Sequence, residues 1–518
     1  MTNKSKMQKG TTAQNSPLGV GGLRGGGSIL HLSDGYKVDH RTQYPTGTEL
    51  VYSNWTPRKS RIAGVDKVVF FGLQYFIKKY LQEEFDQNFF QKPKGEVVKK
   101  YRRRISTYIG PDAITYDHIE ALHDLGYMPV EIKALPEGML VPMRMPMFTI
   151  KNTLPEFFWV TNFLETILSC IIWMPCTSAT MSLQYRKILD RYADKTGGDK
   201  ALVDWQAHDF SFRGMAGLEA AMMSGAGHLL NFTGTDTIPA IDFLEEYYGA
   251  DSDKELVGGS VPATEHSVMC MGMEDSEIET FRRLINNVYK TGIVSIVSDT
   301  WDFWKVITVY LQELKNEILA RDGKVVIRPD SGDPVKIICG DPNATAGTPE
   351  FKGAVECLWG TFGGTMTDKG YKILDEHIGL IYGDSITLER CEAICSQLEA
   401  KGFASTNVVF GIGSYTYQYV TRDTFGFAMK ATYGEVNGEG RAIFKNPKTD
   451  DGTKISAKGL IRLDGNELEV TTMTDEVSKE EEAGGLLEVV YRDGEILKEV
   501  KLEGIRKLLR RQVELVNV

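Results

Sequence analysis

The sequence of 518 residues has few cysteines and no excess of positive charge. Its seven cysteines are scattered, odd in number and without a C-x-x-C pair, which argues against a disulfide framework or a cysteine-ligated zinc site. We therefore expect free thiols in a reducing, cytoplasmic compartment. The formal net charge of -11 argues against a general nucleic-acid or membrane-surface binder, and we interpret the local basic run at residues 92–104 as a solvated helix face.

The sequence also lacks the apolar segments of exported or membrane proteins. Residues 1–27 contain no apolar signal region, so we expect no secretory signal, and we predict that the glycine-rich leader, residues 1–28, is disordered. The apolar window at residues 157–175 is nearly long enough to span a bilayer, but it stands alone and holds Asn162 and Glu165. It predicts a buried helix of a soluble core.

The two ends of the chain carry mixed helix and strand patterns. Apolar residues recur at helical spacing over residues 68–81 and 159–171, whereas residues 130–150 alternate as in short antiparallel strands. Alternation returns beyond Arg422, with turn signals at Asn437-Gly438, Asp464-Gly465 and Asp493-Gly494, and a charged helix at residues 505–513. We expect residues 29–200 and 416–518 to form one α+β domain with an antiparallel sheet.

The middle of the chain repeats one pattern, a strand-like run that ends in polar groups. Most of these runs lie about 25–35 residues apart, which is the length of one βα unit. Seven runs carry the pattern: 208–210, 231–236, 260–266, 294–299, 325–334, 380–384 and 408–414. The pattern favours an irregular (β/α) barrel over residues 201–415, with a doubly wound open sheet as the alternative.

Residues 325–334, VVIRPDSGDP, show most clearly where a site would lie. A β-branched apolar run ends at Arg328, because two prolines and a glycine cannot continue the strand. Arg328, Asp330 and Asp333 therefore lie at the carboxyl end of a buried strand, which is where ligands bind in α/β folds. The alternative is a polar loop that caps the next helix.

Acidic side chains predominate at these strand ends, so a cation is expected where they converge. Carboxylates with few cations suit magnesium and a polyphosphate ligand. Gly411-x-Gly413-Ser414 can offer backbone N–H groups to a phosphate, and Arg422 could complete that site. The candidate groups are Asp209, Arg213, Asp236, Glu265, His266, Asp299, Asp302, Arg328, Asp330, Asp333, Asp384 and the loop 411–414.

Three further residues have both a structural and a functional interpretation. His266 follows Glu265, and a carboxylate can orient and activate an imidazole, although a lone histidine is usually a satisfied polar group. Phe210 and Tyr36 are aromatic residues in polar segments, and core packing is the default for Phe210. Metal ligation by His266 is disfavoured, because no second histidine lies at ligand spacing.

Nine motifs in order resemble those of the nicotinamide phosphoribosyltransferases, from about residue 30 to the C-terminal helix. They are SDGYKVDHRTQYP, FFGLQYFIKKYL, IKALPEGMLVP, HDFSFRGMAGLEAA, NFTGTDT, SVPATEHS, VSIVSDTWD, IRPDSGDP and GIGSYTYQYVTRD. The resemblance implies transfer of phosphoribose from phosphoribosyl pyrophosphate to nicotinamide, giving nicotinamide mononucleotide and pyrophosphate in NAD salvage. It also implies a homodimer with active sites shared between subunits.

The resemblance implies roles for residues at the base. Phe210 and Tyr36, the latter from the partner subunit, would stack the pyridine ring, as aromatic faces suit an electron-poor ring. Asp236 would accept hydrogen bonds from the carboxamide and repel the carboxylate of nicotinate. Arg213 matches the arginine that contacts the base, and Ser260, Ala263 and Ser295 are further predicted substrate-binding residues.

It also implies a phosphate and ribose side. Contacts to the ribose would come from Arg328 and Asp330, with Asp384 in the same wall and Gly383 as a further substrate-binding residue. The 5′-phosphate would bind Gly413, Ser414 and a neighbouring subunit's Arg422. Cations around the phosphates match Arg58, Lys430 and Lys445. Asp299 and Asp330 are the implied magnesium-side carboxylates, with Mg²⁺ as the expected cofactor.

His266 matches the histidine that ATP phosphorylates in the family, where optional ATP hydrolysis favours the transfer. Two positions depart from the mammalian form: Ser414 replaces a glycine, and Ser385 follows Gly383-Asp384 in a shorter loop. A nicotinate or quinolinate phosphoribosyltransferase is the near alternative, and Asp236 disfavours it because an acidic substrate calls for a cation. A catalytically silent nucleotide-binding barrel is the alternative from another class.

Overall fold

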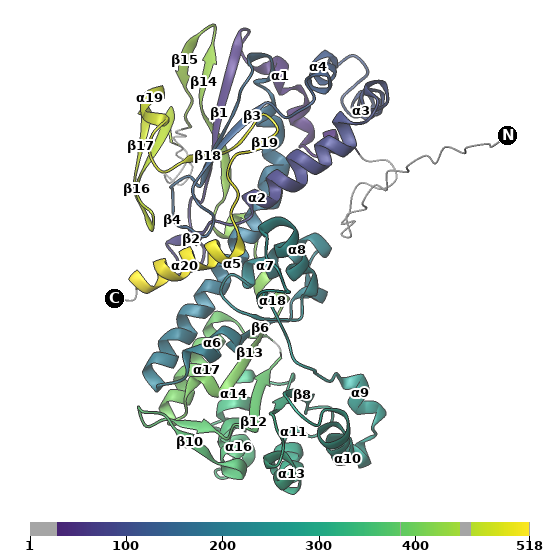
Figure 1. The fold of residues 1–518 in the computed structure, drawn as a ribbon, viewed down its shortest axis with the longest axis vertical. Coiled ribbons are helices and arrows are strands. Elements are labelled where there is room, and N and C mark those ends of the chain that lie inside the picture. The colour runs from purple at the N-terminus through teal and green to yellow at the C-terminus, as the bar shows by residue number, and fades with distance from the viewer. Residues whose placement is uncertain (1–27, 384, 446–456, 517–518) are drawn as a thin grey trace, which may run out of the picture.

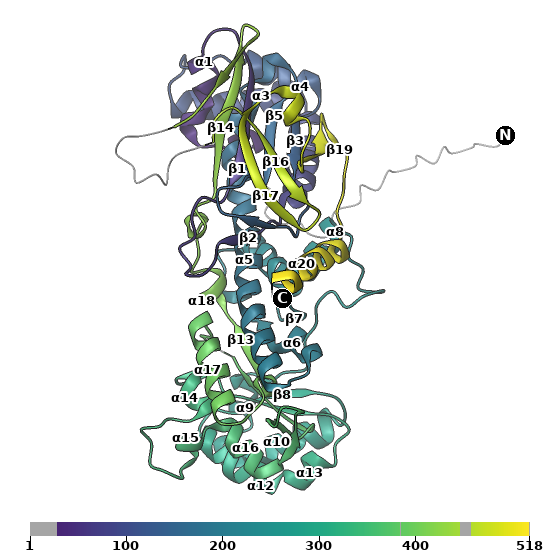
Figure 2. The same cartoon turned by 90° about the vertical axis from the view of Figure 1, so that its left-hand side faces the viewer.

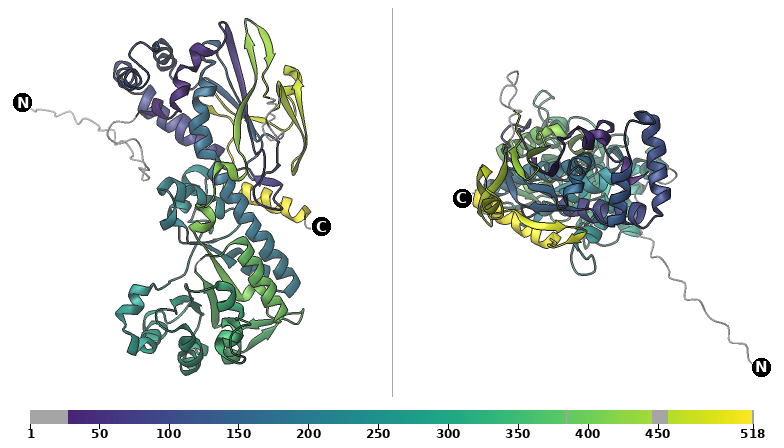
Figure 3. Two further views of the ribbon diagram at one scale, coloured as in Figure 1. Left: turned by 180° about the vertical axis from the view of Figure 1, so that it is seen from behind. Right: turned by 90° about the horizontal axis from the view of Figure 1, so that it is seen from above.

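The computed structural model describes residues 28–383, 385–445 and 457–516, so nearly all of the predicted disordered leader lies outside the described residues. The described chain forms two lobes arranged along one axis, and the long helix α5 (Val160–Thr196) runs from one lobe into the other (Figures 1 and 2). One lobe holds an antiparallel sheet and the other a parallel sheet (Figure 3). This α/β architecture confirms the predicted fold class.

The antiparallel sheet is built from both ends of the chain, in the order β15-β14-β1-β5-β3-β18-β19. β1 pairs with β14 and β3 with β18, which joins the N-terminal to the C-terminal segment as predicted. The bounds are β1 Thr48–Thr56, β3 Val130–Ala134, β5 Phe148–Asn152, β14 Ala428–Val436, β15 Glu439–Ala442, β18 Glu488–Arg492 and β19 Glu495–Ile496. The boundaries proposed for the domains stay a prediction.

The other lobe contains a curled sheet of six parallel strands, in the order β7-β6-β13-β12-β9-β8. Their bounds are β6 Ala207–Asp209, β7 Gly234–Thr235, β8 Val294–Val297, β9 Val325–Arg328, β12 Ile378–Tyr382 and β13 Val408–Ile412. Six of the seven predicted strands are therefore present. The strand expected at residues 260–266 is wrong, since only single-residue bridges form there, from Gly259 to Gly234 and from Ala263 to Ser295.

Those two bridges join the opposite edges of the parallel sheet. Gly259 reaches edge strand β7, and Ala263 reaches edge strand β8. Pro262, which has no N–H, lies between them and accepts a hydrogen bond from Ser295 N (2.9 Å) instead of donating one. The irregular (β/α) barrel is confirmed, and the doubly wound open sheet is excluded.

Helix α5 connects the two lobes, and α7 (Leu218–His228) and α17 (Leu388–Ala400) pack against it. By length and composition α5 could cross a membrane, but 78% of its most apolar window is buried, as in the core helix predicted there. The other α-helices of eight or more residues in the described chain are α3 Lys94–Tyr108, α4 Asp117–Leu125, α8 Ile238–Tyr248, α16 Ala354–Phe362 and α20 Leu502–Val516. Shorter helices of the parallel-sheet lobe include α6 Lys200–Gln206, α9 His266–Met271, α10 Glu277–Arg283 and α14 Pro334–Cys339.

Two local predictions are wrong. The helix expected over residues 68–81 begins only at Leu73, because Val68 and Val69 belong to strand β2 (Lys67–Val69), which pairs with β4 (Leu140–Pro142). Gly72, at φ 106°, makes the turn between strand and helix α2 (Leu73–Phe76). The turn expected at Asp464-Gly465 lies further along, where the Asn466 side chain accepts the N–H groups of Leu468 and Glu469.

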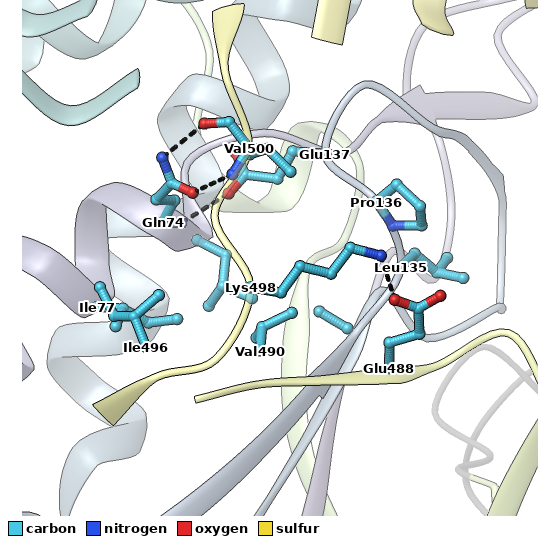
Figure 4. Close-up of a pocket in the computed structure, with 12 residues that line it drawn as sticks. Gln74, Ile77, Leu135, Pro136, Glu137, Glu488, Val490, Ile496, Lys498 and Val500 are labelled. Carbon is cyan, nitrogen blue, oxygen red and sulfur yellow. Dashed lines mark hydrogen bonds and ion pairs between the residues drawn. The ribbon is translucent and has the colours of Figure 1, made fainter. Parts of the chain in front are cut away.

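The C-terminal segment at Val500 is hydrogen-bonded to α2 beside a small cavity of about 30 Å³ (Figure 4). The Gln74 side chain donates to Val500 O (2.9 Å) and to Tyr247 O (2.6 Å), and it accepts from Val500 N (2.7 Å). Lys498 and Glu488 form an ion pair across the same cavity. One amide side chain therefore connects α2, α8 and the chain that leads into α20 (Leu502–Val516).

Glu137 is a buried carboxyl group at the start of α2. It accepts the N–H groups of Gly72 and Gln74 (2.6 Å each) and the Tyr248 hydroxyl (3.0 Å). Burial raises the pKa of Glu137 to about 7, against the lowering effect of these hydrogen bonds. The folded protein therefore holds a proton that the unfolded chain releases at lower pH.

This raised pKa makes stability depend on pH. The stability that the proton contributes is complete below about pH 4.5 and is lost as pH rises through about 7. Relative to Glu137→Gln, which does not titrate, the wild-type free energy of unfolding should fall by up to about 3 kcal/mol over that range. Urea unfolding of both proteins at a series of pH values measures the difference. A difference that stays constant between pH 5 and 8 would contradict the raised pKa.

Candidate active site

A cavity of about 680 Å³ lies at the carboxyl ends of the parallel strands. It is where the strand-end pattern in the sequence predicts a site. The residues that line it are Phe210, Phe212, Arg213, Gly214, Asp236, Arg328, Asp330, Gly383, Gly413, Ser414, Tyr415, Gln418 and Tyr419. Eight of the predicted site residues are among them, drawn from the ends of five strands.

Phe210 forms one wall of the cavity. The β6–β13 pairing extends to it, because Phe210 N donates to Ile412 O (2.9 Å). The guanidinium of Arg328 lies over the ring, with its central carbon 4.9 Å from the ring centroid. A flat apolar face therefore lies next to a fixed positive charge.

Arg328 and two carboxylates form a connected group at the ends of β8 and β9. Asp330 holds Arg328 in a bidentate contact, with Nε 3.1 Å and Nη2 3.2 Å from the two oxygens. Asp299 Oδ2 accepts Asp330 N (2.9 Å) and Ser331 Oγ (2.6 Å). Oδ1 of Asp299 is buried and has no hydrogen-bond partner among the described residues.

Asp236 provides the negative charge beside Phe210. Its Oδ1 accepts His208 Nε2 (2.8 Å) and Ser260 Oγ (2.8 Å). Burial acts to raise the pKa of Asp236, but the hydrogen bonds from His208 and Ser260 and the charge of Arg328 outweigh it and lower the pKa below its usual value. The carboxylate is therefore ionised at neutral pH and half-exposed to the cavity.

His266 lies at the start of α9, outside the lining of the cavity. Its Nδ1 is 3.3 Å from Thr300 Oγ1, and its Nε2 is 3.8 Å from Asp299 Oδ1. The expectation that Glu265 orients this imidazole is wrong, because Glu265 accepts the Ser267 hydroxyl. Asp299 is the carboxylate that faces His266.

A second group of predicted residues lies away from this cavity, around β1 and β14 in the other lobe. Arg58 Nε donates to Gly426 O (2.9 Å), and Arg422 is 3.7 Å from Asp423. Partial removal from water lowers the pKa of Lys430, and Arg58, Lys445 and Lys37 lower it further against Glu165. Tyr36 is 65% exposed, and none of Tyr36, Arg58, Arg422, Lys430 and Lys445 lines the cavity of its own chain.

The remaining predicted site residues that the structure describes do not line the cavity. Ser295 is buried with its hydroxyl unpaired among the described residues, and Ala263 is bridged to it. Asp302 and Asp333 cap α11 (Phe303–Lys305) and α14, so for them the polar-cap interpretation holds. Asp384 lies outside the described residues.

Sequence reasoning missed four side chains. His208 lies at a predicted strand end, but nothing in the sequence indicates that it bonds Asp236. Tyr415, Gln418 and Tyr419 line the cavity, and the two tyrosine rings stack at 4.5 Å. They follow the glycine loop at i, i+3 and i+4 spacing, which is the signal for one helical turn there, although the helix itself spans only Ser414–Tyr417.

The acidic residues supply too few ligands to hold magnesium alone. They suit a magnesium ion that also binds a phosphate ligand. The described residues contain no group of three metal-ligating side chains. The unpaired buried Oδ1 of Asp299 fits one cation contact, whereas both Asp330 oxygens are engaged by Arg328. Magnesium typically takes one or two carboxylates, with water and phosphate oxygens completing the shell, so the donor set is compatible with it.

Similarity to solved structures agrees with this fold. A nicotinate-nucleotide pyrophosphorylase from Pyrococcus furiosus superposes with a TM-score of 0.57 at 14% identity, covering 95% of this chain and 97% of that one. A human nicotinic acid phosphoribosyltransferase gives a TM-score of 0.50 at 15% identity, over 93% of both chains. At these identities the likeness concerns the fold alone.

Sequence comparison is more specific. A nicotinamide phosphoribosyltransferase from Acinetobacter baylyi is 56% identical over 94% of this chain and 97% of its own length. One from Xanthomonas campestris is 32% identical over 92% and 97%. Residues 28–132 match the nicotinamide phosphoribosyltransferase N-terminal domain, and residues 205–495 match the nicotinate phosphoribosyltransferase (NAPRTase) family. With its site at the expected strand ends, the chain belongs to the nicotinate phosphoribosyltransferase family.

Proposed function

We infer that the protein is a nicotinamide phosphoribosyltransferase. It transfers the phosphoribosyl group of phosphoribosyl pyrophosphate to the ring nitrogen of nicotinamide, forming nicotinamide mononucleotide and releasing pyrophosphate. The observation that carries this conclusion is the ionised Asp236 beside the Phe210 face in the cavity. A carboxylate accepts hydrogen bonds from an amide and repels an acid, so the site suits nicotinamide and disfavours nicotinate.

Different residues of the cavity would contact the base, the ribose and the phosphate. Phe210 offers the face for the pyridine ring, and Arg213 lies at the same wall. Gly413 and Ser414, where β13 passes into α18 (Ser414–Tyr417), lie where a 5′-phosphate would meet backbone N–H groups. Arg328, Asp330 and Gly383 lie between base and phosphate, where the ribose would lie.

Positioning and electrostatics account for the chemistry. As the bond from the anomeric carbon to pyrophosphate breaks, positive charge develops on the ribose, and the nicotinamide nitrogen supplies the electron pair of the new bond. Holding the ring nitrogen in line with the anomeric carbon converts an encounter into a unimolecular step. Asp330, which Arg328 holds in place, would stabilise the developing positive charge.

We propose magnesium as the cofactor, which Asp299 and Asp330 would hold together with the phosphate ligand. When bound, the ion neutralises charge on the pyrophosphate leaving group. Asp299 would offer Oδ1, which accepts no hydrogen bond among the described residues, while its other oxygen fixes the backbone of Asp330.

We also propose that the active sites are completed by a second subunit. The cations Arg58, Arg422, Lys430 and Lys445 and the exposed ring of Tyr36 lie outside the cavity of their own chain. A C2 dimer could place them over the partner's cavity, where Tyr36 would cover the second ring face and the cations would meet phosphates.

We further propose that ATP phosphorylates His266. The half-exposed imidazole has one nitrogen near the Thr300 hydroxyl and the other near Asp299, so it is accessible and oriented. An imidazole nitrogen would form the P–N bond to the γ-phosphoryl group while ADP leaves.

The first prediction concerns substrate selection. Asp236→Asn should lower kcat/KM for nicotinamide about tenfold to a hundredfold, because a charge-assisted hydrogen bond is weakened. The loss for nicotinate should be smaller, since the repulsion is removed. Mononucleotide formation from each base, with phosphoribosyl pyrophosphate and magnesium, measures both. Equal losses for the two bases would contradict a selective role for Asp236.

The second prediction concerns shared sites. Asp330→Ala should inactivate the cavity half of a site and Arg422→Ala the cation half. Refolding or co-expressing the two variants together should restore about a quarter of wild-type activity, since half of random dimers are mixed and each mixed dimer keeps one intact site. Each variant alone is the control. Activity no higher than either control would contradict sites built from two chains.

The third prediction concerns ATP. In His266→Ala the ratio of transfer rates with and without ATP should fall to about one, because the phosphoryl acceptor is absent. His377→Ala is a matched control and should keep the wild-type ratio, because His377 bonds Asp375 at the amino end of β12, whereas the cavity lies at the carboxyl ends of the strands. Stimulation by ATP that persists in His266→Ala would refute the phosphohistidine.

A further inference from the structure

His208 contacts two residues of the base end of the cavity without lining it. It lies on β6, and its side chain is only 9% exposed. Its Nε2 is 2.8 Å from Asp236 Oδ1, and its ring centroid is 4.7 Å from that of Phe210, with an interplanar angle of 40°. The ring therefore lies behind the residue that selects the base and beside the residue that stacks it.

The hydrogen bonds divide the two oxygens of Asp236 between the protein and the cavity. Oδ1 accepts both His208 Nε2 and Ser260 Oγ. Among the described residues, no hydrogen bond or ion pair reaches Oδ2, and the side chain is 44% exposed. Because a carboxylate only accepts, Nε2 of His208 carries the proton that it donates. One oxygen is thus held by two donors and the other stays available.

Gly234 gives an independent sign that the position of this imidazole matters. It faces His208 across the parallel β6–β7 pair, and its backbone does not have the positive φ that favours glycine. A methyl group at Gly234 would lie 2.7 Å from His208 Nδ1 and 3.2 Å from Cγ. Position 234 therefore requires glycine because the imidazole of His208 leaves no room for a side chain there. The backbone conformation of Gly234 does not itself require glycine.

We propose that His208 is a positioning residue for amide selection, and that Gly234 leaves the room it needs. With Ser260, it fixes the carboxylate of Asp236 so that Oδ2 points to the carboxamide of nicotinamide. A carboxylate that two donors already hold in place loses little conformational entropy when the substrate binds. This inference rests on the proposed function, since it assigns His208 a role in how Asp236 meets that substrate.

The test is a double-mutant cycle on steady-state kinetics. His208→Leu should raise KM for nicotinamide about tenfold, the effect of one hydrogen bond to a charged group, with KM for phosphoribosyl pyrophosphate within about twofold of wild type. His208→Gln, whose amide can donate to Asp236, should recover most of the loss. In the Asp236→Asn background, His208→Leu should add little, because its partner charge is already gone.

Two further variants keep the test informative if His208→Leu folds poorly. Ser260 is exposed, so Ser260→Ala removes the other donor without disturbing the core and should raise KM for nicotinamide a few-fold, again without adding to Asp236→Asn. Gly234→Ala should imitate His208→Leu by displacing the ring. Thermal unfolding of each variant separates these effects from loss of fold.

The outcomes are distinct. Losses from His208→Leu and Ser260→Ala that add fully to those of Asp236→Asn would overturn the positioning role, as would His208→Gln no better than His208→Leu. Absence of nicotinamide turnover by the wild-type protein would instead overturn the proposed function, and this assignment with it. A non-additive cycle with rescue by glutamine supports the role of His208.

Discussion

The parallel pairing of β6 with β13 is the constraint on which the site depends. Its register sets Gly411 against His208 and Ile412 against Asp209, and Phe210 continues it by donating to Ile412 O. The next residues are the aromatic wall on one strand and Gly413-Ser414 on the other. One row of backbone hydrogen bonds therefore fixes the distance between the base end and the phosphate end of the cavity.

Around the β6–β13 pairing, three of the carboxylates at the site are held by hydrogen-bond donors or a positive charge. Asp330 is held by Arg328, Asp299 by backbone and hydroxyl donors, and Asp236 by His208 and Ser260. Among the described residues, neither Oδ1 of Asp299 nor Oδ2 of Asp236 accepts a hydrogen bond; the first faces His266 Nε2 at 3.8 Å, and the second is available at the base end of the cavity. Preorganised groups of this kind need little rearrangement during the reaction, which is how electrostatic stabilisation is most effective.

The sequence predicts the strands well, because β-branched runs that end in Asp, Arg or Gly are distinctive at a spacing of one βα unit. It fails where pairing depends on distant partners: β7 has only two residues, and the segment at 260–266 contributes bridges instead of a strand. The start of α2 was also misplaced, because Val68 and Val69 fit a helix and a strand equally until β4 is known to lie beside them.

Roles of single residues are harder to predict than elements. Asp302 and Asp333 follow strands as Asp299 and Asp330 do, yet they cap helices, and only the local hydrogen bonds distinguish the two uses. His266 was paired with its chain neighbour Glu265, whereas its carboxylate is Asp299 on another strand end. His208 was missed because its partner, Asp236, lies on the neighbouring strand.

A crystal structure of the protein with bound nicotinamide mononucleotide tests the central claim most directly. The account predicts the pyridine ring on the face of Phe210, its carboxamide nitrogen within hydrogen-bond distance of Asp236 Oδ2, and the 5′-phosphate at Gly413 and Ser414. A carboxamide directed away from Asp236, or a nucleotide bound outside this cavity, would contradict it.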